Sequence, residues 1–183
     1  MESLTTPQGS IWHLLKPVDA VLRRNRQVRA FFDELSEVLF NYRYRPVANF
    51  VGTSQQVYLG LGVYGNGVLY VDQPENEKGL RYRNIHLGEV YFVENHAGVI
   101  DTMYRCYQLS IRQIMERFGD KAPDEIRDAA KNAQLVDTKK EILHVVAPRK
   151  DYMPGGLGQE NMPFKSCYYL VETKAELEEG GSD

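Results

Sequence analysis

Two apolar runs flank an Asn-Gly pair in the middle of the chain. The run Val57–Tyr64 alternates apolar and small residues, ends at Gly65-Asn66-Gly67, and is followed by the run Val68–Val71. Asn-Gly between apolar runs is typical of a tight β-hairpin, because both central residues of such a turn need positive φ. The pattern therefore predicts a hairpin with Asn66 at its turn.

Two further β-rich runs, Leu80–Ile85 and Glu89–Val93, extend the predicted hairpin into a meander of strands over residues 56–93. The period then changes, because apolar residues recur at three- and four-residue spacing as far as Phe118. This spacing predicts one long helix, residues 98–118, packed on the sheet. Three of its residues are expected to be buried: Tyr107, Ile111 and Phe118.

Shorter elements are expected on both sides of this segment. Pro17–Arg24 and Val28–Asn41 have the pattern of N-terminal helices, and Pro123–Ala133 that of a short later helix. Residues 141–147 and 166–173 are rich in β-branched and aromatic side chains and are expected to be strands. The order of the elements predicts an α+β fold with a mostly antiparallel sheet.

One domain is expected over residues 10–173. The chain has 183 residues, 43% of them hydrophobic, which is enough to bury a core. Residues 1–9 are polar and are expected to be flexible, and the acidic residues 174–183 are expected to form a disordered tail. The loop 149–163 is long for a compact domain, so it is either a lid or merely mobile.

Charge and composition narrow the classes of function. The formal net charge is -3 at pH 7, so any contact with nucleic acid is restricted to a local patch. No run of eighteen or more apolar residues is present, so no membrane span is expected. Two cysteines do not make a disulfide framework, and a cytoplasmic location is therefore expected.

Arginine interleaved with tyrosine is the most distinctive local pattern. It occurs at Tyr42-Arg43-Tyr44-Arg45, at Arg81-Tyr82-Arg83 and around Arg105. On a strand, the two arginines of the second group share one face, so their guanidinium groups project side by side. Such a pair fits the anionic group of a nucleotide, an RNA strand or a carboxylate cofactor, and nearby rings can stack on a base. In the structural alternative, the arginines pair with neighbouring carboxylates on a solvated face.

A second group of candidate residues surrounds the expected junction between the last strand of the meander and the long helix. His86, Glu89 and His96 are residue types that bind metals or transfer protons. Their spacing matches no known ligand pattern, so no metal site is predicted, and the sequence identifies no cofactor. The complete set of candidate ligand-binding residues is Arg81, Tyr82, Arg83, Tyr44, Arg45, Arg105, His86 and His96.

Three functions remain open from the sequence. The first is a non-catalytic module that holds an anionic or planar ligand, such as a nucleotide, or a partner segment on its Tyr/Arg-rich sheet face. The second is a small enzyme that uses His86, Glu89 and His96. The third is a protein–protein assembly or adaptor protein, including a homo-oligomer, since Tyr and Arg are also enriched at protein interfaces.

Overall fold

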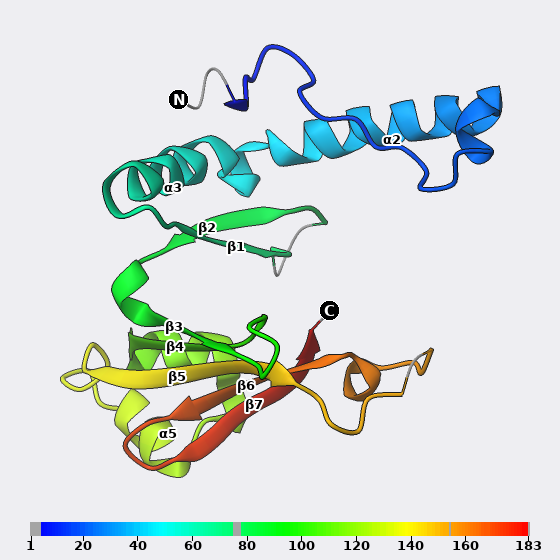
Figure 1. The fold of residues 1–183 in the computed structure, drawn as a ribbon. Helices are drawn as coiled ribbons and strands as arrows, with labels where there is room; N and C mark the ends of the chain where they lie inside the picture. Colours follow the sequence, from blue (N-terminus) through cyan, green and yellow to red (C-terminus); the bar gives the residue numbers. More distant parts are fainter. Residues whose placement is uncertain (1–4, 75–77, 154, 183) are drawn as a thin grey trace. The chain divides into compact units, whose positions relative to one another are not determined.

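The computed structural model describes residues 5–74, 78–153 and 155–182 (Figure 1). These residues form two compact units, Met1–Leu87 and Gly88–Asp183, where the sequence predicts one domain. Each unit has its own sheet and its own buried cluster.

Two helices and a two-stranded antiparallel hairpin make up the first unit. Its elements are η1 (Leu22–Arg24), α2 (Arg26–Arg43), η2 (Pro46–Ala48), α3 (Phe50–Tyr64), β1 (Val68–Asp72) and β2 (Arg81–Ile85). The buried cluster consists of Ala48, Phe50 and Tyr82, against which Tyr44 and Leu80 pack. The hydroxyl of Thr53 donates to the carbonyl oxygen of Tyr82 at 3.0 Å, which ties α3 to the hairpin.

A five-stranded antiparallel sheet forms the second unit, in the order β3-β4-β5-β6-β7 (Figure 1). Its strands are β3 (Val90–Glu94), β4 (Ile100–Ser110), β5 (Lys139–Pro148), β6 (Phe164–Leu170) and β7 (Ala175–Ser182). Its helices are η3 (Leu87–Glu89, at the boundary), α4 (Ile111–Phe118), η4 (Gly119–Lys121), α5 (Asp124–Ala130) and η5 (Gln159–Asn161). Ile111, Ile114 and Phe118 of α4 pack with Ile126 of α5 against Ile142 of β5, which gives this unit its core.

The α+β fold with antiparallel sheets is confirmed. The strands expected in Leu80–Ile85 and Glu89–Val93 are β2 and β3, and those expected at 141–147 and 166–173 are β5 and most of β6. Ile111 and Phe118 are buried, as expected, and Tyr107 is half-buried.

The predicted hairpin around Asn66 is wrong. Val57–Tyr64 is the second half of α3, which ends at Gly65 with φ of 72°. Among the described non-glycine residues, positive φ occurs at Asn49 and Lys174, so Asn66 is not in the left-handed region. The apolar run has consecutive apolar residues at Val57-Tyr58-Leu59, and a run without strict alternation is equally compatible with a helix.

The predicted long helix over residues 98–118 is also wrong. Its first part is β4, which pairs with β3 on one side and β5 on the other, and its last part is the separate helix α4. The side chain of Ser110 accepts a hydrogen bond from the backbone N–H of Gln113, and the side chain of Gln113 accepts one from the N–H of Ser110. This capping box starts α4 at the point where β4 ends.

Both ends of the chain are more ordered than the sequence suggests. Residues 175–182 of the expected disordered tail form β7, which pairs with β6 and buries Leu177 in the core. Thr6, in the expected flexible N-terminus, is buried; residues 1–4 and Asp183 lie outside the described residues. Of the predicted helix Pro17–Arg24, only the three residues of η1 are helical.

Candidate functional site

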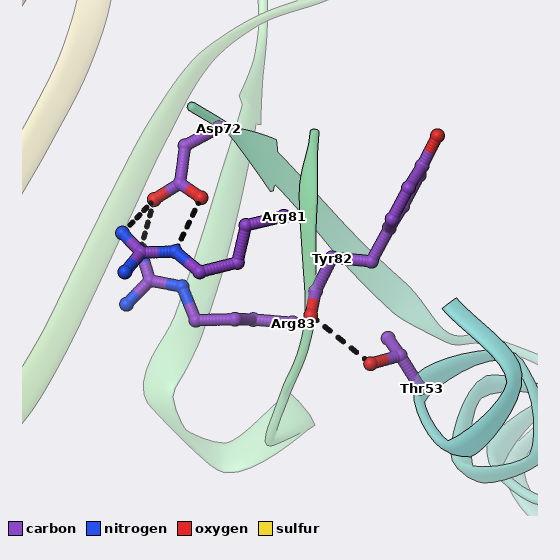
Figure 2. Close-up of polar contacts among 5 residues, drawn as sticks. All are labelled: Thr53, Asp72, Arg81, Tyr82 and Arg83. Atoms are coloured by element: carbon purple, nitrogen blue, oxygen red, sulfur yellow. Dashed lines mark hydrogen bonds and ion pairs between the residues drawn. The ribbon is translucent and has the colours of Figure 1, made fainter. Parts of the chain in front are cut away.

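Arg81 and Arg83 lie on the same face of β2, as the sequence predicts, and both bind one carboxylate of the neighbouring strand (Figure 2). Arg81 donates from Nε to Oδ1 and from Nη2 to Oδ2 of Asp72, both at 2.8 Å. Arg83 donates from Nη2 to Oδ2 of the same residue at 2.7 Å. The anion between the two guanidinium groups is therefore a side chain of the chain itself.

The electrostatics of this triad favour an ionised Asp72. Burial by itself would raise the pKa of the Asp72 carboxyl, but the hydrogen bonds and charges of Arg81 and Arg83 outweigh burial and lower it. Arg83 also lies over the ring of Tyr70, 4.9 Å from its centroid, and its Nε is buried without a hydrogen-bond partner. The triad thus holds β1 and β2 together at the end of the hairpin where the connecting loop begins.

Tyr82 points to the other side of the hairpin (Figure 2). Its ring is buried and meets that of Phe50 edge-on, with a centroid distance of 4.9 Å. Its hydroxyl accepts a hydrogen bond from Nε of Arg43 at 3.3 Å. The structure therefore places Tyr82 in the core of the first unit, away from the two arginines beside it.

The other tyrosine–arginine positions are dispersed. Tyr44 donates its hydroxyl hydrogen to the carbonyl oxygen of Thr6 at 2.8 Å, whereas Arg45 is exposed and stacks on Tyr42, 3.9 Å from the ring centroid. Arg105 belongs to the second unit, on β4. The structure thus brings Arg81 and Arg83 together but does not gather the full set of candidate residues into one site.

The residues of the expected acid–base junction belong to two units. His86 is in the first unit, whereas Glu89 and the exposed His96 are in the second. The carboxylate of Glu89 accepts two hydrogen bonds from Arg105, at 3.1 and 2.9 Å, and that guanidinium lies over the ring of Tyr107. Within the described residues no three His, Cys, Asp or Glu side chains are grouped as a metal site would require.

The surroundings of the two cysteines are typical of structural residues. Burial is the main cause that raises the pKa of the Cys106 thiol, and its hydrogen bond to Glu141, at 3.2 Å, acts in the same direction. A raised pKa lowers the fraction of thiolate, which is the nucleophilic form. Cys167 is buried.

Sequence analysis missed a large exposed apolar surface on the helices of the first unit. On α3, Leu59 and Val63 lie one turn apart and their side chains are 68% and 70% exposed. On α2, the exposed residues Phe31, Leu35 and Val38 have the spacing of a single helical stripe. The sequence does contain a signal for the α3 surface, since residues 46–71 include no charged residue.

The second unit also exposes apolar side chains, at the edge of its sheet. Tyr91, Phe92 and Val93 of β3 are exposed, so this edge strand presents apolar side chains on both of its faces, although Val90 is buried. Leu157, in the loop between β5 and β6, is 91% exposed. In the part of the chain that the structure describes, no helix is both long and apolar enough to cross a membrane.

Comparisons with known proteins identify the family. A family model described as bacteriophage head to tail connecting protein matches residues 1–183. The chain is similar to the portal protein of Salmonella phage epsilon15 and to the probable portal protein of Bordetella phage BPP-1, with 25% identity to each over 114 residues. The matched region is 62% of this chain and 20% of each relative, so the chain spans about a fifth of the length of these curated relatives. The chain belongs to the bacteriophage head to tail connecting protein family.

Proposed function

We propose that this chain is a structural part of a phage connector and that copies of it assemble through the exposed apolar surface of α3. The family supports an assembly role, and both curated relatives are named as portal proteins or probable portal proteins. The observation that carries the proposal is the exposure of Leu59 and Val63 on an uncharged helix.

The composition of α3 gives the physical argument. Residues 57–64, the second half of α3, are apolar or glycine on every side of the helix, a composition typical of a helix that is buried all round. The buried residues of α3, however, are Phe50, Thr53 and Ser54, all in its first half. Burying a large aliphatic side chain contributes about 1.5–3 kcal/mol. Because α3 has no charged residue, two copies of it can meet without contact between like charges.

The ligand-binding alternative has less support than the assembly alternative. It depends on Arg81 and Arg83 presenting their charge to an external anion, and both guanidinium groups are bound to Asp72. An external phosphate or carboxylate would have to displace a carboxylate that is held at 2.7–2.8 Å. The Tyr/Arg pattern is therefore better explained as a structural feature of the hairpin.

The test is the mass of the protein in solution, measured by light scattering over a range of concentrations. Unmodified protein is expected to reach a multiple of 21.0 kDa. The double variant Leu59→Glu/Val63→Glu is expected to remain near 21.0 kDa, because charges on an apolar interface must be desolvated. Leu157→Glu is the matched control, since it changes a highly exposed leucine outside α3, and it is expected to assemble normally. A double variant that assembles like the unmodified protein would refute the proposal.

A further inference from the structure

Residues 5–17, the N-terminal strap, are fastened to the helices of the first unit by hydrogen bonds from several positions. The backbone N–H of Leu15 donates to Oγ of Ser36 at 2.9 Å, and Ser36 is fully buried in the middle of α2. At the C-terminal end of α2, Nε1 of Trp12 donates to the hydroxyl of Tyr44, the C-cap residue of the helix, at 3.0 Å. The strap therefore follows α2 and covers part of its surface.

His13 lies between these two attachments and faces a cation. Its Nδ1 is 3.2 Å from Nη1 of Arg43. An arginine side chain can only donate, so Nδ1 must accept, and His13 must be neutral with its proton on Nε2. The same guanidinium lies 4.7 Å from the ring centroid of Trp12 and 5.4 Å from that of Phe50. Arg43 thus holds both His13 and Trp12 of the strap.

The surroundings of His13 contain positive charge and no compensating carboxylate among the described contacts. The charged group of α2 that faces His13 is Arg43. The group that β2 brings to Arg43 is the hydroxyl of Tyr82, which is neutral and accepts a hydrogen bond from Arg43. The strap carries Lys16 three residues after His13 in the sequence, and α3 has no charged residue. Burial, and then the charge of Arg43, lower the pKa of His13 below 6.5, and Nε2 of His13 is buried without a partner.

We propose that the strap is a pH-sensitive clasp: protonation of His13 replaces its hydrogen bond to Arg43 with a contact between two cations and releases the strap from α2 and α3. Release uncovers aromatic side chains of the helices. Phe40 is stacked on the ring of His13, Phe50 is stacked on that of Trp12, and Tyr44 is bonded to the strap. The clasp thus controls access to an aromatic surface at the corner between α2 and α3.

The direction of the pH dependence follows from the two states of His13. In the released strap, His13 has an ordinary pKa of 6.5, and in the closed strap its pKa is lower. The released state therefore binds the proton more readily. The clasp has its full stability above pH 6.5 and loses it as the pH falls from 6.5 through the lower pKa of the closed state.

Trp12 reports on the clasp directly, because it is the single tryptophan of the chain. The measurement is the acrylamide quenching constant of its fluorescence in the full chain, from about pH 8 to about pH 5. Acrylamide measures access to the ring and is therefore not confused with quenching by the neighbouring imidazolium. For unmodified protein the constant is expected to rise toward that of free tryptophan below pH 6.5, while the far-ultraviolet circular dichroism stays constant.

Two variants make the test specific. Trp12 is 36% exposed in the closed strap, so its starting quenching constant is intermediate. His13→Gln can accept the Arg43 hydrogen bond at every pH, so its quenching constant is expected to keep this starting value throughout the titration. His96→Gln removes an exposed histidine of the second unit and is expected to keep the response of the unmodified protein. The proposal is overturned if His13→Gln responds like unmodified protein, if the quenching constant of unmodified protein does not rise by about pH 5, or if it rises only when the helices unfold.

Discussion

At the scale of single residues, Asp72 explains why the sequence left two interpretations of Arg81 and Arg83 open. Strand alternation correctly predicts that the two arginines share a face. The partner is Asp72, which the sequence places nine residues before Arg81, and pairing of β1 with β2 brings it directly opposite. A residue pattern on one strand identifies the charged pair, but the register of the neighbouring strand decides what neutralises it.

Replacing Asp72 with Asn is expected to lower the free energy of unfolding by about 1–3 kcal/mol, because two guanidinium groups lose their shared carboxylate and repel each other. Screening by solvent keeps the loss modest, since the side chains of Arg81 and Arg83 are 33% and 36% exposed. Denaturant unfolding measures the change. Asp128→Asn removes the exposed partner of Lys131 and is the control; equal shifts in both variants would contradict the structural role of Asp72.

The contribution of Asp72 should also depend on pH. Its pKa is lower in the folded protein than the ordinary value of 3.8, so the unfolded chain takes up the proton first as the pH falls. The stabilisation is therefore present above pH 3.8 and is lost as the pH falls through the folded pKa. The difference in unfolding free energy between unmodified protein and Asp72→Asn is expected to stay constant from about pH 6 to about pH 4 and to shrink as the pH falls below 3.8, as urea titrations can measure. A difference that stayed constant below pH 3.8 as well would mean that Asp72 is not ionised in this pair.

At the scale of elements, the sequence predicts strands well where local composition agrees with the final pairing. Residues 141–147 are β-branched and lie in β5, the strand at the centre of its sheet. The segment 98–118 is harder to assign, because the apolar residues of β4, Ile100, Met103, Tyr104 and Tyr107, also fit helical spacing. Residues 100–110 nevertheless form a strand, because β3 and β5 supply backbone hydrogen bonds on both sides. This pairing is a long-range effect that the periodicity of one segment does not reveal.

Local signals for two of the misassigned boundaries are nevertheless present. Ser110 followed by Gln113 is the signature of a capping box and marks where α4 begins. Gly65 is a left-handed cap that ends α3, so the Gly-Asn-Gly sequence serves a helix end instead of a hairpin turn. Both signals depend on knowing which element comes before them, and this is why the sequence alone did not resolve them.

Ser110→Ala distinguishes the capped helix from the long helix by the sign of its effect. In the structure the change removes an N-cap and is expected to cost about 1 kcal/mol of unfolding free energy. In the middle of a long helix the same change would stabilise the protein, because alanine has the higher helix propensity. Thermal or denaturant unfolding gives the sign, and Gln113→Ala, which removes the reciprocal bond, is expected to act in the same direction.

Two glycines near the end of α3 should respond in opposite directions to alanine. A Cβ at Gly62 would meet nothing within 4 Å, so Gly62→Ala is expected to stabilise the helix by about 0.5–1 kcal/mol. A Cβ at Gly67 would lie 3.0 Å from the carbonyl oxygen of Val57, so Gly67→Ala is expected to destabilise the protein. Denaturant midpoints of the two variants that shift in the same direction would contradict the packing of β1 against α3.

At the scale of the whole chain, the distribution of charge accounts for the proposed role. Residues 46–71 contain no charged residue, and they include all of α3 and nearly all of β1. The enrichment of Tyr and Arg made a protein assembly one of the three functions that the sequence left open. The residues on which the assembly proposal depends are different ones, Leu59 and Val63, and the sequence pattern placed them on a strand. Their exposure follows from the helix and could not be predicted before the helix was known.

The central claim is that α3 becomes buried when copies of the chain assemble. Hydroxyl-radical labelling followed by mass spectrometry tests it directly, on assembled protein and on the 21.0 kDa form after separation by size. Leu59 and Val63 are expected to be labelled less in the assembled form, whereas Leu157 is expected to be labelled equally in both. Equal labelling of Leu59 and Val63 in the two forms, or a mass of 21.0 kDa at every concentration, would contradict the account.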